Sequence, residues 1–254
     1  MNRTAKQLLY GFGYVAFFSL IGGFIYTGFF RVPASCVDGE ENQGEQGVDC
    51  GGPCTQACLP SDLRPLEVAG QVRMLYPDRA HFGLLAKLVN PNIELGARSF
   101  EYNFRVYDES GGLIQSFSGR SFIYPGEAER YLLLPLLPLP RVPIARADLV
   151  VDREEWVSGD VFPRPKIAVQ YYNTAASEGL LAAEGRIFSN DTRSFPSVTV
   201  IAIFYGQFGQ IVGASLTELA NVVPNEARDF VVRHPLVPGA SAARTQVFIF
   251  ALRP

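Results

Sequence analysis

The sequence predicts an all-β protein that carries one N-terminal transmembrane helix, a small disulfide-rich module and two tandem β-sandwiches. Three observations support this fold class. The chain of 254 residues has an uncharged run near its N-terminus that is long enough to cross a bilayer, and its four cysteines lie in a 23-residue segment after that run. The remainder reads as short strands separated by turn signals, and this pattern occurs twice.

The N-terminal run extends from residue 8 to residue 30 and contains no charged side chain. A helix of this length spans about 34 Å, slightly more than the hydrocarbon core of a bilayer. Arg3 and Lys6 precede the run, so the positive-inside tendency predicts a cytoplasmic tail of residues 1–7 and an extracytoplasmic location for the rest of the chain. The first predicted partner is therefore the lipid bilayer, contacted through residues 8–30 of a single-pass protein of the cell membrane.

Two processed forms compete with a retained anchor. Residues 32–34 offer small side chains where a signal peptidase is able to cut, but the apolar run exceeds the usual length of a signal-peptide core. Residues 33–36 offer a lipidation box that ends at Cys36. However, Pro33 stands where leucine is usual, and lipidation of Cys36 would leave an odd number of cysteines, three, for disulfide pairing. We favour the retained anchor.

The cysteines Cys36, Cys50, Cys54 and Cys58 lie in a segment rich in turn-forming residues and poor in side chains that could fill a core. Such a segment folds only when it is cross-linked. Two disulfides are the favoured cross-link in an oxidising compartment, and three pairings are open. Zinc is the alternative, but the Cys-x3-Cys-x3-Cys spacing lacks the usual pair and export disfavours free thiolates. The sequence thus predicts a disulfide module over residues 34–60.

Four oxygen donors lie between the first two cysteines: Asp38, Asn42, Glu45 and Asp49. Side chains of this kind bind calcium, which is the one cofactor that the sequence suggests. Their spacing does not match an EF-hand loop, so solvated turn residues are an equally good interpretation. Both interpretations stay open.

Beyond Pro60 the chain reads as strands with period-two alternation and many β-branched or aromatic residues. The clearest strands are residues 100–107, 130–134, 166–172, 198–205 and 246–252. Turn signals such as Ser110-Gly111-Gly112 separate them. Because no amphipathic helix of three turns interrupts this pattern, an all-β sandwich is favoured over a βαβ enzyme.

The strand and turn pattern repeats with an offset of 97 to 100 residues. The turn Pro125-Gly126-Glu127, for instance, corresponds to Pro224-Asn225-Glu226. This offset is the size of one immunoglobulin-like sandwich. The sequence therefore predicts two such domains, over residues 64–153 and residues 154–254.

The cysteine-rich segment resembles a known motif. The run from Cys36 to Cys54 is similar to the pattern Cys-x-Asp-Gly-x-x-Asn-x-Gly-Glu-x-Gly-Val-Asp-Cys-Gly-Gly-x-Cys, found in many exported bacterial proteins that include predicted envelope proteins of candidate-phyla bacteria. The resemblance covers about a tenth of the chain. It implies a small disulfide-bonded surface module and no particular reaction.

The two repeats resemble FxLYD domains, an immunoglobulin-like family of bacteria and archaea. The resemblance rests on residues 104–108, Phe-Arg-Val-Tyr-Asp, followed by Pro125-Gly126-Glu127. The second copy departs from the signature, with Ala-Ile-Phe-Tyr-Gly at residues 202–206. The resemblance implies an immunoglobulin-like fold and an extracytoplasmic location for these repeats. The functions of the family's members are mostly undefined. Val106 and Phe204 are expected at corresponding core positions.

Composition and motifs argue against an enzyme and against nucleic-acid binding. A net charge of -3 gives no broad basic field. The histidines His81 and His234 fall in different repeats, and we find no nucleophile elbow, phosphate loop or His-Glu-x-x-His motif. We therefore expect no catalytic residues.

Two functional classes fit this organisation. The first, which we favour, is a non-enzymatic protein of the cell envelope that presents an adhesion, assembly or scaffolding surface to a protein partner. The second is an accessory sensory ectodomain that binds a ligand through a sandwich face or calcium through the cysteine-rich loop.

Overall fold

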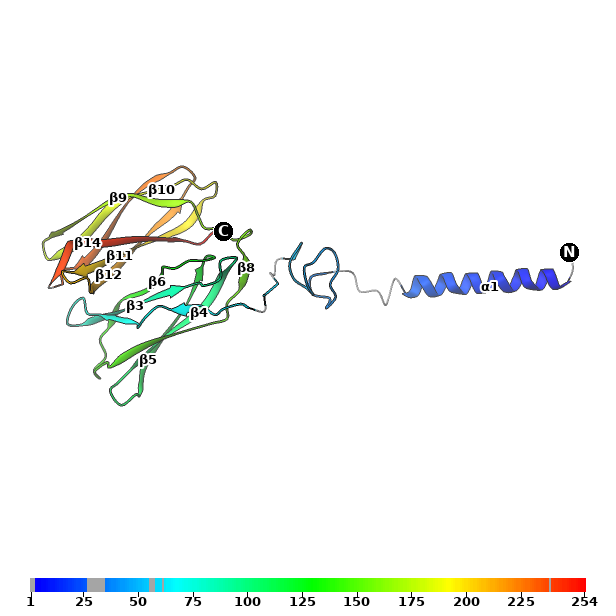
Figure 1. Ribbon diagram of the computed structural model, residues 1–254, viewed down its shortest axis with the longest axis horizontal. Helices are drawn as coiled ribbons and strands as arrows, with labels where there is room; N and C mark the ends of the chain where they lie inside the picture. The colour runs from blue at the N-terminus through cyan, green and yellow to red at the C-terminus, as the bar shows by residue number, and fades with distance from the viewer. Residues whose placement is uncertain (1–2, 27–34, 55–57, 61, 238) are drawn as a thin grey trace. The chain divides into compact units, whose positions relative to one another are not determined.

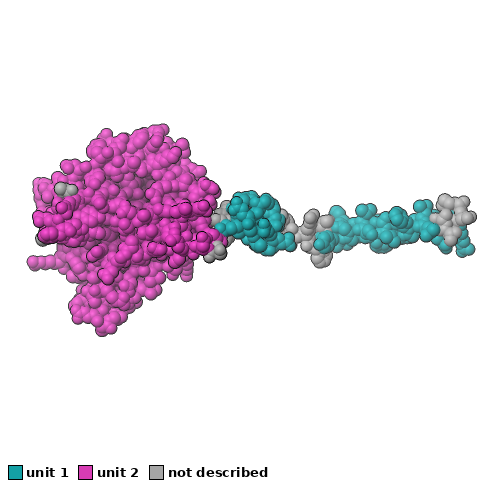
Figure 2. Space-filling model, in the orientation of Figure 1, with its two compact units in different colours: residues 1–58 teal, residues 59–254 magenta. Residues whose placement is uncertain are grey.

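The protein divides into two compact units. The structure, a computed structural model, describes residues 3–26, 35–54, 58–60, 62–237 and 239–254. Strands account for 53% of the chain and helix for 9%, which confirms the predicted all-β fold class. The first unit is residues 1–58 and the second is residues 59–254 (Figure 2).

Helix α1 (Arg3–Ile25) forms the N-terminal part of the first unit. Within it the stretch Lys6–Ile25 has a mean hydropathy of 1.8, and its most apolar window contains no buried residue. A core helix of a soluble domain would be buried, so this exposed apolar surface is typical of a membrane anchor or a signal sequence. The predicted apolar helix is confirmed to residue 25, whereas residues 27–30 of the expected span lie outside the described residues.

The first sandwich of the second unit consists of two antiparallel sheets (Figure 1). In one sheet β3 (His81–Val89) is the central strand. It pairs with β6 (Arg130–Pro138) along one edge and with the short strands β1 (Glu67–Val68) and β2 (Arg73–Leu75) along the other. In the other sheet β4 is central; the bounds are β4 (Leu95–Tyr107), β5 (Leu113–Ile123), β7 (Arg146–Asp152) and β8 (Trp156–Ser158). Leu84, Phe100 and Phe104 are among the side chains of the core between the sheets.

The second sandwich has the strand orders β13-β10-β9 and β12-β11-β14. The bounds of the first sheet are β9 (Ile167–Ser177), β10 (Leu180–Ser189) and β13 (Ala227–Pro235). Those of the second are β11 (Phe195–Gly206), β12 (Ile211–Val222) and β14 (Ala240–Ala251). Its own core includes Ile187, Val200 and Phe204, which alternate with outward-facing residues along their strands.

The two sandwiches have equivalent topologies. Strands β3 to β7 of the first copy correspond in order to β10 to β14 of the second, and β9 takes the place of the short strands β1 and β2. Val106 and Phe204 are both fully buried, and each directly precedes a register shift in its hairpin. The hairpins turn at Gly111 and Gly209, whose φ angles of 83° and 79° favour glycine. The predicted repeat is thus a structural repeat.

The Pro-x-Glu turns have the same hydrogen bonds in both copies. Oε2 of Glu127 accepts a bond of 2.8 Å from the backbone amide of Tyr124, and Oε2 of Glu226 accepts one of 2.8 Å from that of Val223. The backbone carbonyl of Glu127 accepts a hydrogen bond from the amide of Asn90, which directly follows β3. The carbonyl of Glu226 accepts one from the amide of Ser189, the last residue of β10. These glutamates therefore tie a turn to the neighbouring strand in each copy.

The change from one sandwich to the next lies further along the chain than the expected boundary at residues 153 and 154. Strand β8 pairs with β4, so Leu95 lies opposite Ser158, and Trp156 packs against the core of the first sandwich. Charged residues and prolines accumulate over residues 151–165, as in a linker, but this stretch contains β8. The second sandwich begins with β9.

A third apolar core joins the two sandwiches, and we call it the seam. It forms where the outer face of the β3 sheet packs against the outer face of the β11 sheet (Figure 1). Its buried residues are Leu75, Leu85, Tyr131, Leu133, Ile201, Ile203, Ala214 and Phe250. Strands β3 and β11 are consequently buried on both faces, and the second unit is a stack of four sheets.

Arg130 reinforces the seam through two aromatic rings. Its guanidinium carbon lies 3.9 Å from the ring centre of Phe122 in the first sandwich and 4.4 Å from that of Phe250 in the second. Burial lowers the pKa of Arg130 to about 10, so the side chain stays charged at neutral pH. Nη2 donates to Oγ of Ser121, whereas Nε and Nη1 have no hydrogen-bond partner within the described residues. The two ring faces therefore supply much of the stabilisation of this buried cation.

Polar contacts extend the seam toward the C-terminus. Oη of Tyr124, in the first sandwich, donates to the carbonyl of Ala251 over 2.7 Å and accepts from the amide of Arg253 over 3.0 Å. The Arg253 guanidinium forms an ion pair of 2.5 Å with Asp191 and donates to the carbonyl of Pro163. The two sandwiches therefore share both an apolar core and a hydrogen-bonded margin.

Candidate functional site

Two disulfides hold the cysteine-rich module. Cys36 pairs with Cys54, and Cys50 pairs with Cys58. Of the three pairings that the sequence left open, the structure selects the one in which the two bridges interlock along the chain. All four thiols are committed to these bonds, so the zinc alternative is excluded in this structure.

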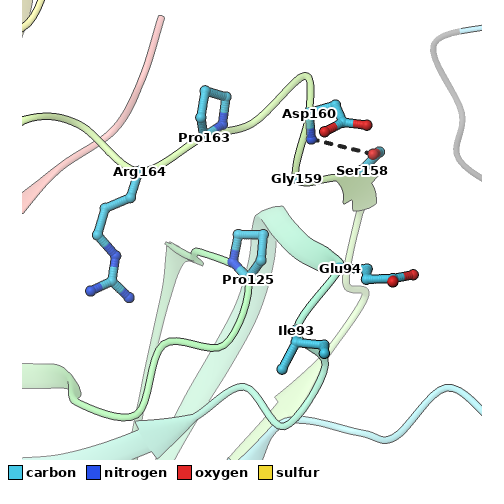
Figure 3. A pocket seen from close by; sticks show the side chains of 8 residues that line it. All are labelled: Ile93, Glu94, Pro125, Ser158, Gly159, Asp160, Pro163 and Arg164. Atoms are coloured by element: carbon cyan, nitrogen blue, oxygen red, sulfur yellow. Dashed lines mark hydrogen bonds between the residues drawn. The ribbon is translucent and has the colours of Figure 1, made fainter.

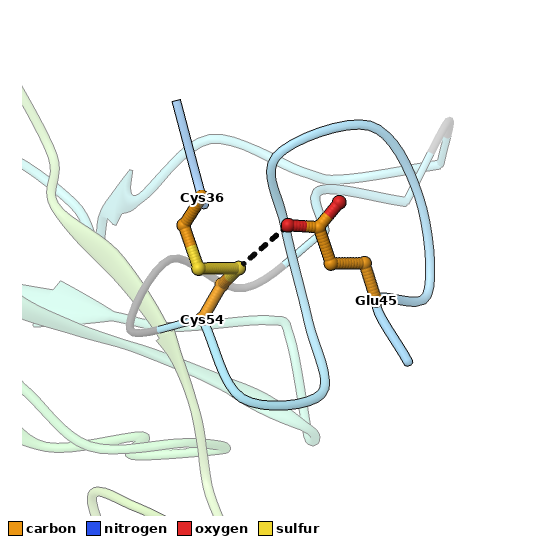
Figure 4. A group of neighbouring side chains, drawn as sticks. All are labelled: Cys36, Glu45 and Cys54. Atoms are coloured by element: carbon orange, nitrogen blue, oxygen red, sulfur yellow. Dashed lines mark hydrogen bonds between the residues drawn. A yellow bond between two sulfur atoms is a disulfide. The ribbon is translucent and has the colours of Figure 1, made fainter. Parts of the chain in front are cut away.

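Glu45 is a buried side chain of this module, with 8% of its surface exposed. Its Oε1 lies 3.0 Å from Sγ of Cys54, in the bridge to Cys36 (Figure 4). Its Oε2 accepts hydrogen bonds from the backbone amides of Asn42 and Asp49 at 3.3 and 3.2 Å. The carboxylate thus serves as an internal acceptor for a loop that has few backbone partners of its own.

Asp38 and Asp49 have similar roles at the start of the module. Oδ1 of Asp49 accepts from the amide of Asp38 over 2.8 Å, and both of its oxygens lie within 3.1 Å of the amide of Gly39. Asp38 accepts from the side-chain amide of Asn42 and from backbone amides of Ser35 and Glu40. These bonds hold the pKa of Asp38 below its usual value, and the bond from Asn42 lowers it most.

The four oxygen donors proposed for calcium therefore lie in one small loop, but each carboxylate already accepts bonds from backbone amides. Among the described residues, one trio of metal-type side chains has ligand atoms within 4.8 Å of one another: Cys36, Glu45 and Cys54. Two of its members are joined as a disulfide and offer no thiolate. Calcium binding by Asp38, Asn42, Glu45 and Asp49 stays a prediction.

An open hollow of about 570 Å³ lies on the second unit, between the first sandwich and the chain segment that leads to β9. Its lining comes from the β3–β4 loop, the β5–β6 turn and the connection from β8 to β9: Ile93, Glu94, Pro125, Ser158, Gly159, Asp160, Pro163 and Arg164. Figure 3 shows the Arg164 guanidinium and the carboxylates of Glu94 and Asp160 separated around its rim. The lining of the hollow therefore carries charges of both signs, and these three side chains do not converge on one point.

His234 forms a histidine–serine pair that the sequence did not reveal. Nδ1 of the imidazole lies 2.9 Å from Oγ of Ser215, and the ring stacks on Phe204 with centres 5.3 Å apart. The imidazole has 3% of its surface exposed, and burial lowers the pKa of His234 to about 4. A Cβ atom added at Gly213 would lie 2.3 Å from Nε2, so the backbone closes over this nitrogen and leaves no room there for a substrate.

His81 lies in the other copy and has a different environment. Its Nδ1 is 2.9 Å from Oδ2 of Asp78 in the turn before β3, and both side chains are exposed. The two histidines therefore occupy separate sandwiches and do not share a site. Only the structure reveals Ser215, because β12 and β13 belong to different sheets of one sandwich.

The comparisons with known proteins identify no family. No protein-family model matches the chain, and no curated protein matches it. Among solved structures, one that it resembles is red sea bream transglutaminase, with 11% identity and a TM-score of 0.23 over 71% of this chain and 29% of that one. The chain thus spans less than a third of that protein, and so low a score carries no argument about fold or activity. The resemblances to the cysteine motif and to FxLYD domains stay predictions.

Proposed function

We propose that the chain is a membrane-anchored extracytoplasmic protein whose two-sandwich unit is a non-enzymatic assembly, adhesion or scaffolding module for a protein partner in the cell envelope. The seam is the observation that carries this proposal. A scaffold must present its surfaces in a fixed geometry, and two tandem domains usually move relative to each other unless their interface is large and apolar. The seam supplies such an interface, with eight buried residues from both sandwiches.

The location is supported by two independent features. The exposed apolar stretch Lys6–Ile25 is long enough to span a bilayer, and the two disulfides are typical of an oxidising compartment. We propose that the helix is retained as a single-pass anchor with a cytoplasmic N-terminus. Residues 59–254 would then lie outside the membrane and be restricted to its surface.

The chemistry of the described polar groups also favours a binding role. Glu127 and Glu226 tie turns, Arg130 lies between two aromatic rings, and His234 is enclosed by its own sandwich. Each of these groups, of which Glu127, Arg130 and His234 are buried, therefore has a structural explanation. The surfaces left for function are the open hollow and the exposed strands, which suit contact with a macromolecule.

Isolation of the full chain from solubilised membranes tests the assembly role. We expect a protein partner to be recovered in stoichiometric amount after treatment of intact cells with a membrane-impermeant cross-linker. The matched control carries residues 1–58 fused to an unrelated soluble domain, and it should not recover that partner. A chain that is recovered alone and binds calcium or a small ligand would contradict this role and favour the accessory sensory ectodomain.

A further inference from the structure

Strand β9 is an exposed sheet edge. Within the described residues it pairs with β10 alone, so its other edge has no ladder partner. Most of its side chains are exposed, including Tyr171 at 57% and Tyr172 at 41%. Ile167 and Val169 pack against the core of the sandwich, and Tyr172 donates from its Oη to the carbonyl of Thr245 in the facing sheet over 2.9 Å. The backbone edge of β9 is therefore open to another strand.

The composition of β9 sets it apart from the other edge strands. Exposed edges are usually protected by charged residues, prolines or short length. Here β1, β2 and β8 have two or three residues, β6 contains two prolines, and β5, β7, β12, β13 and β14 each contain at least one charged residue. Strand β9, Ile-Ala-Val-Gln-Tyr-Tyr-Asn-Thr-Ala-Ala-Ser, has 11 residues and neither charge nor proline. It lacks the charges, prolines and short length that protect the other edges, although its pairing with β10 has a register shift between Val169 and Tyr171.

The charges that flank β9 are complementary under two-fold symmetry. Lys166 directly precedes the strand and Glu178 directly follows it, and both side chains are exposed. If two copies of β9 pair antiparallel over their full length with no register shift between them, the axis passes through Tyr172. Each Lys166 then lies opposite the Glu178 of the other copy, whereas a parallel pair would place like charges together. A contact of this kind is isologous and closes after two chains.

We propose that β9 is the surface through which two copies of this chain associate, by antiparallel pairing that joins the two β13-β10-β9 sheets into one. The two Tyr172 side chains lie opposite each other at the axis, and Tyr171 lies opposite Asn173 of the second copy. Such cross-strand pairs stabilise sheets, and the backbone hydrogen bonds satisfy the open edge. This inference rests on the proposed assembly role and names a second copy as one partner.

Charge reversal measures the contribution of the flanking pairs. Lys166→Glu or Glu178→Lys places like charges opposite each other at both ends of the dimer, and each variant should weaken self-association of the full chain in detergent about tenfold. The double variant exchanges the charges, and its affinity should return to within about twofold of the original. Glu109→Lys is the matched control for Glu178→Lys, because it makes the same charge change in an exposed turn of the first sandwich. Sedimentation equilibrium gives the dissociation constants.

Cysteine cross-linking tests the register. Copies with Tyr171→Cys and copies with Asn173→Cys should form a mixed disulfide when they are co-expressed with different tags, because opposite residues lie about 5 Å apart. Either variant alone should cross-link poorly, since its two cysteines would be about 8 Å apart. Gln115→Cys, exposed on the edge strand β5, is the control and should remain uncross-linked.

Three outcomes would overturn the inference. The first is a monomeric chain. The second is a dimer whose dissociation constant changes no more with either charge reversal than with Glu109→Lys, and the third is a dimer in which the mixed disulfide does not form. The second would also describe a dimer held by the membrane helix alone. Recovery of a monomeric chain with a different stoichiometric protein would overturn pairing through β9 but leave the proposed assembly role in place.

Discussion

Replacing Phe204 with alanine is expected to lower the free energy of unfolding by roughly 3 to 5 kcal/mol, as is usual for a phenylalanine removed from a protein core. Phe204 is fully buried and stacks on the imidazole of His234. The substitution leaves a cavity between the two sheets of the second sandwich. Urea unfolding of the full chain in detergent, followed by circular dichroism, gives the change in free energy.

A second probe in the same experiment reports on the seam. Trp156 is the only tryptophan of the chain, and it packs in the first sandwich. If the seam makes the two sandwiches unfold together, Phe204→Ala should shift the transition seen by Trp156 fluorescence as well. Phe208→Ala, which removes a ring that is 91% exposed in the turn after the same strand, is the matched control and should change stability by less than about 0.5 kcal/mol. A loss below about 1 kcal/mol for Phe204→Ala would show that this ring does not support the core.

Acidification should destabilise the second sandwich through His234. Burial lowers the pKa of His234 from its usual 6.5 to about 4, so the unfolded chain binds more protons than the folded chain between these values. The stability supplied by the neutral imidazole is therefore complete above pH 6.5 and is lost as the pH falls toward 4. Allowing for residual solvation, we expect a loss of roughly 1 kcal/mol at pH 5.5 and on the order of 2 kcal/mol at pH 4.5.

Two measurements isolate this effect from the titration of carboxylates. His234→Gln should flatten the dependence of the unfolding free energy on pH between 5 and 6.5, and His81→Gln, at the exposed histidine of the other sandwich, is the matched control. If His234→Gln does not fold, NMR titration of the unmodified chain measures the pKa of His234 directly. The signals can be assigned because the chain contains only two histidines. An imidazole of His234 that titrates near 6.5 would contradict the predicted burial.

The sequence was most informative for elements that show one clear local pattern of apolar, polar and charged residues. The uncharged run predicts α1, and the alternation of apolar and polar residues predicts strands that the structure extends by several residues at their ends, as in β4 and β11. The repeat predicts equivalent topologies, because turn residues such as Gly111 and Gly209 fix the same hairpin in both copies. These features depend on local patterns that one chain segment carries by itself.

The seam was missed because its signal is easily assigned to a single core. On β11, Val200 and Phe204 face the core of their own sandwich, while Ile201 and Ile203 face the first sandwich. The result is a nearly continuous apolar run, which is typical of a strand buried on both faces. The same pattern occurs on β3, so two such runs in different domains could have indicated that the domains pack against each other.

For the cysteine-rich module, the sequence predicted which residues take part but only partly how they are arranged in space. The disulfides of the four cysteines were expected, but their pairing depends on how the loop folds and cannot be deduced from spacing. The burial of Glu45 and the contact between Ser215 and His234 are likewise tertiary properties. Strand β8 was assigned to the wrong sandwich because its charged surroundings resemble a linker.

Protease treatment of spheroplasts tests most directly the central claim that this chain is an anchored extracytoplasmic protein. With different tags at the two ends of the full chain, added protease should remove the C-terminal tag and spare the N-terminal one, and both should be lost after detergent lysis. The mature chain should still begin before residue 8. Complete protection of the C-terminal tag in intact spheroplasts, or a mature chain that begins near Ser35 or Cys36, would contradict the account.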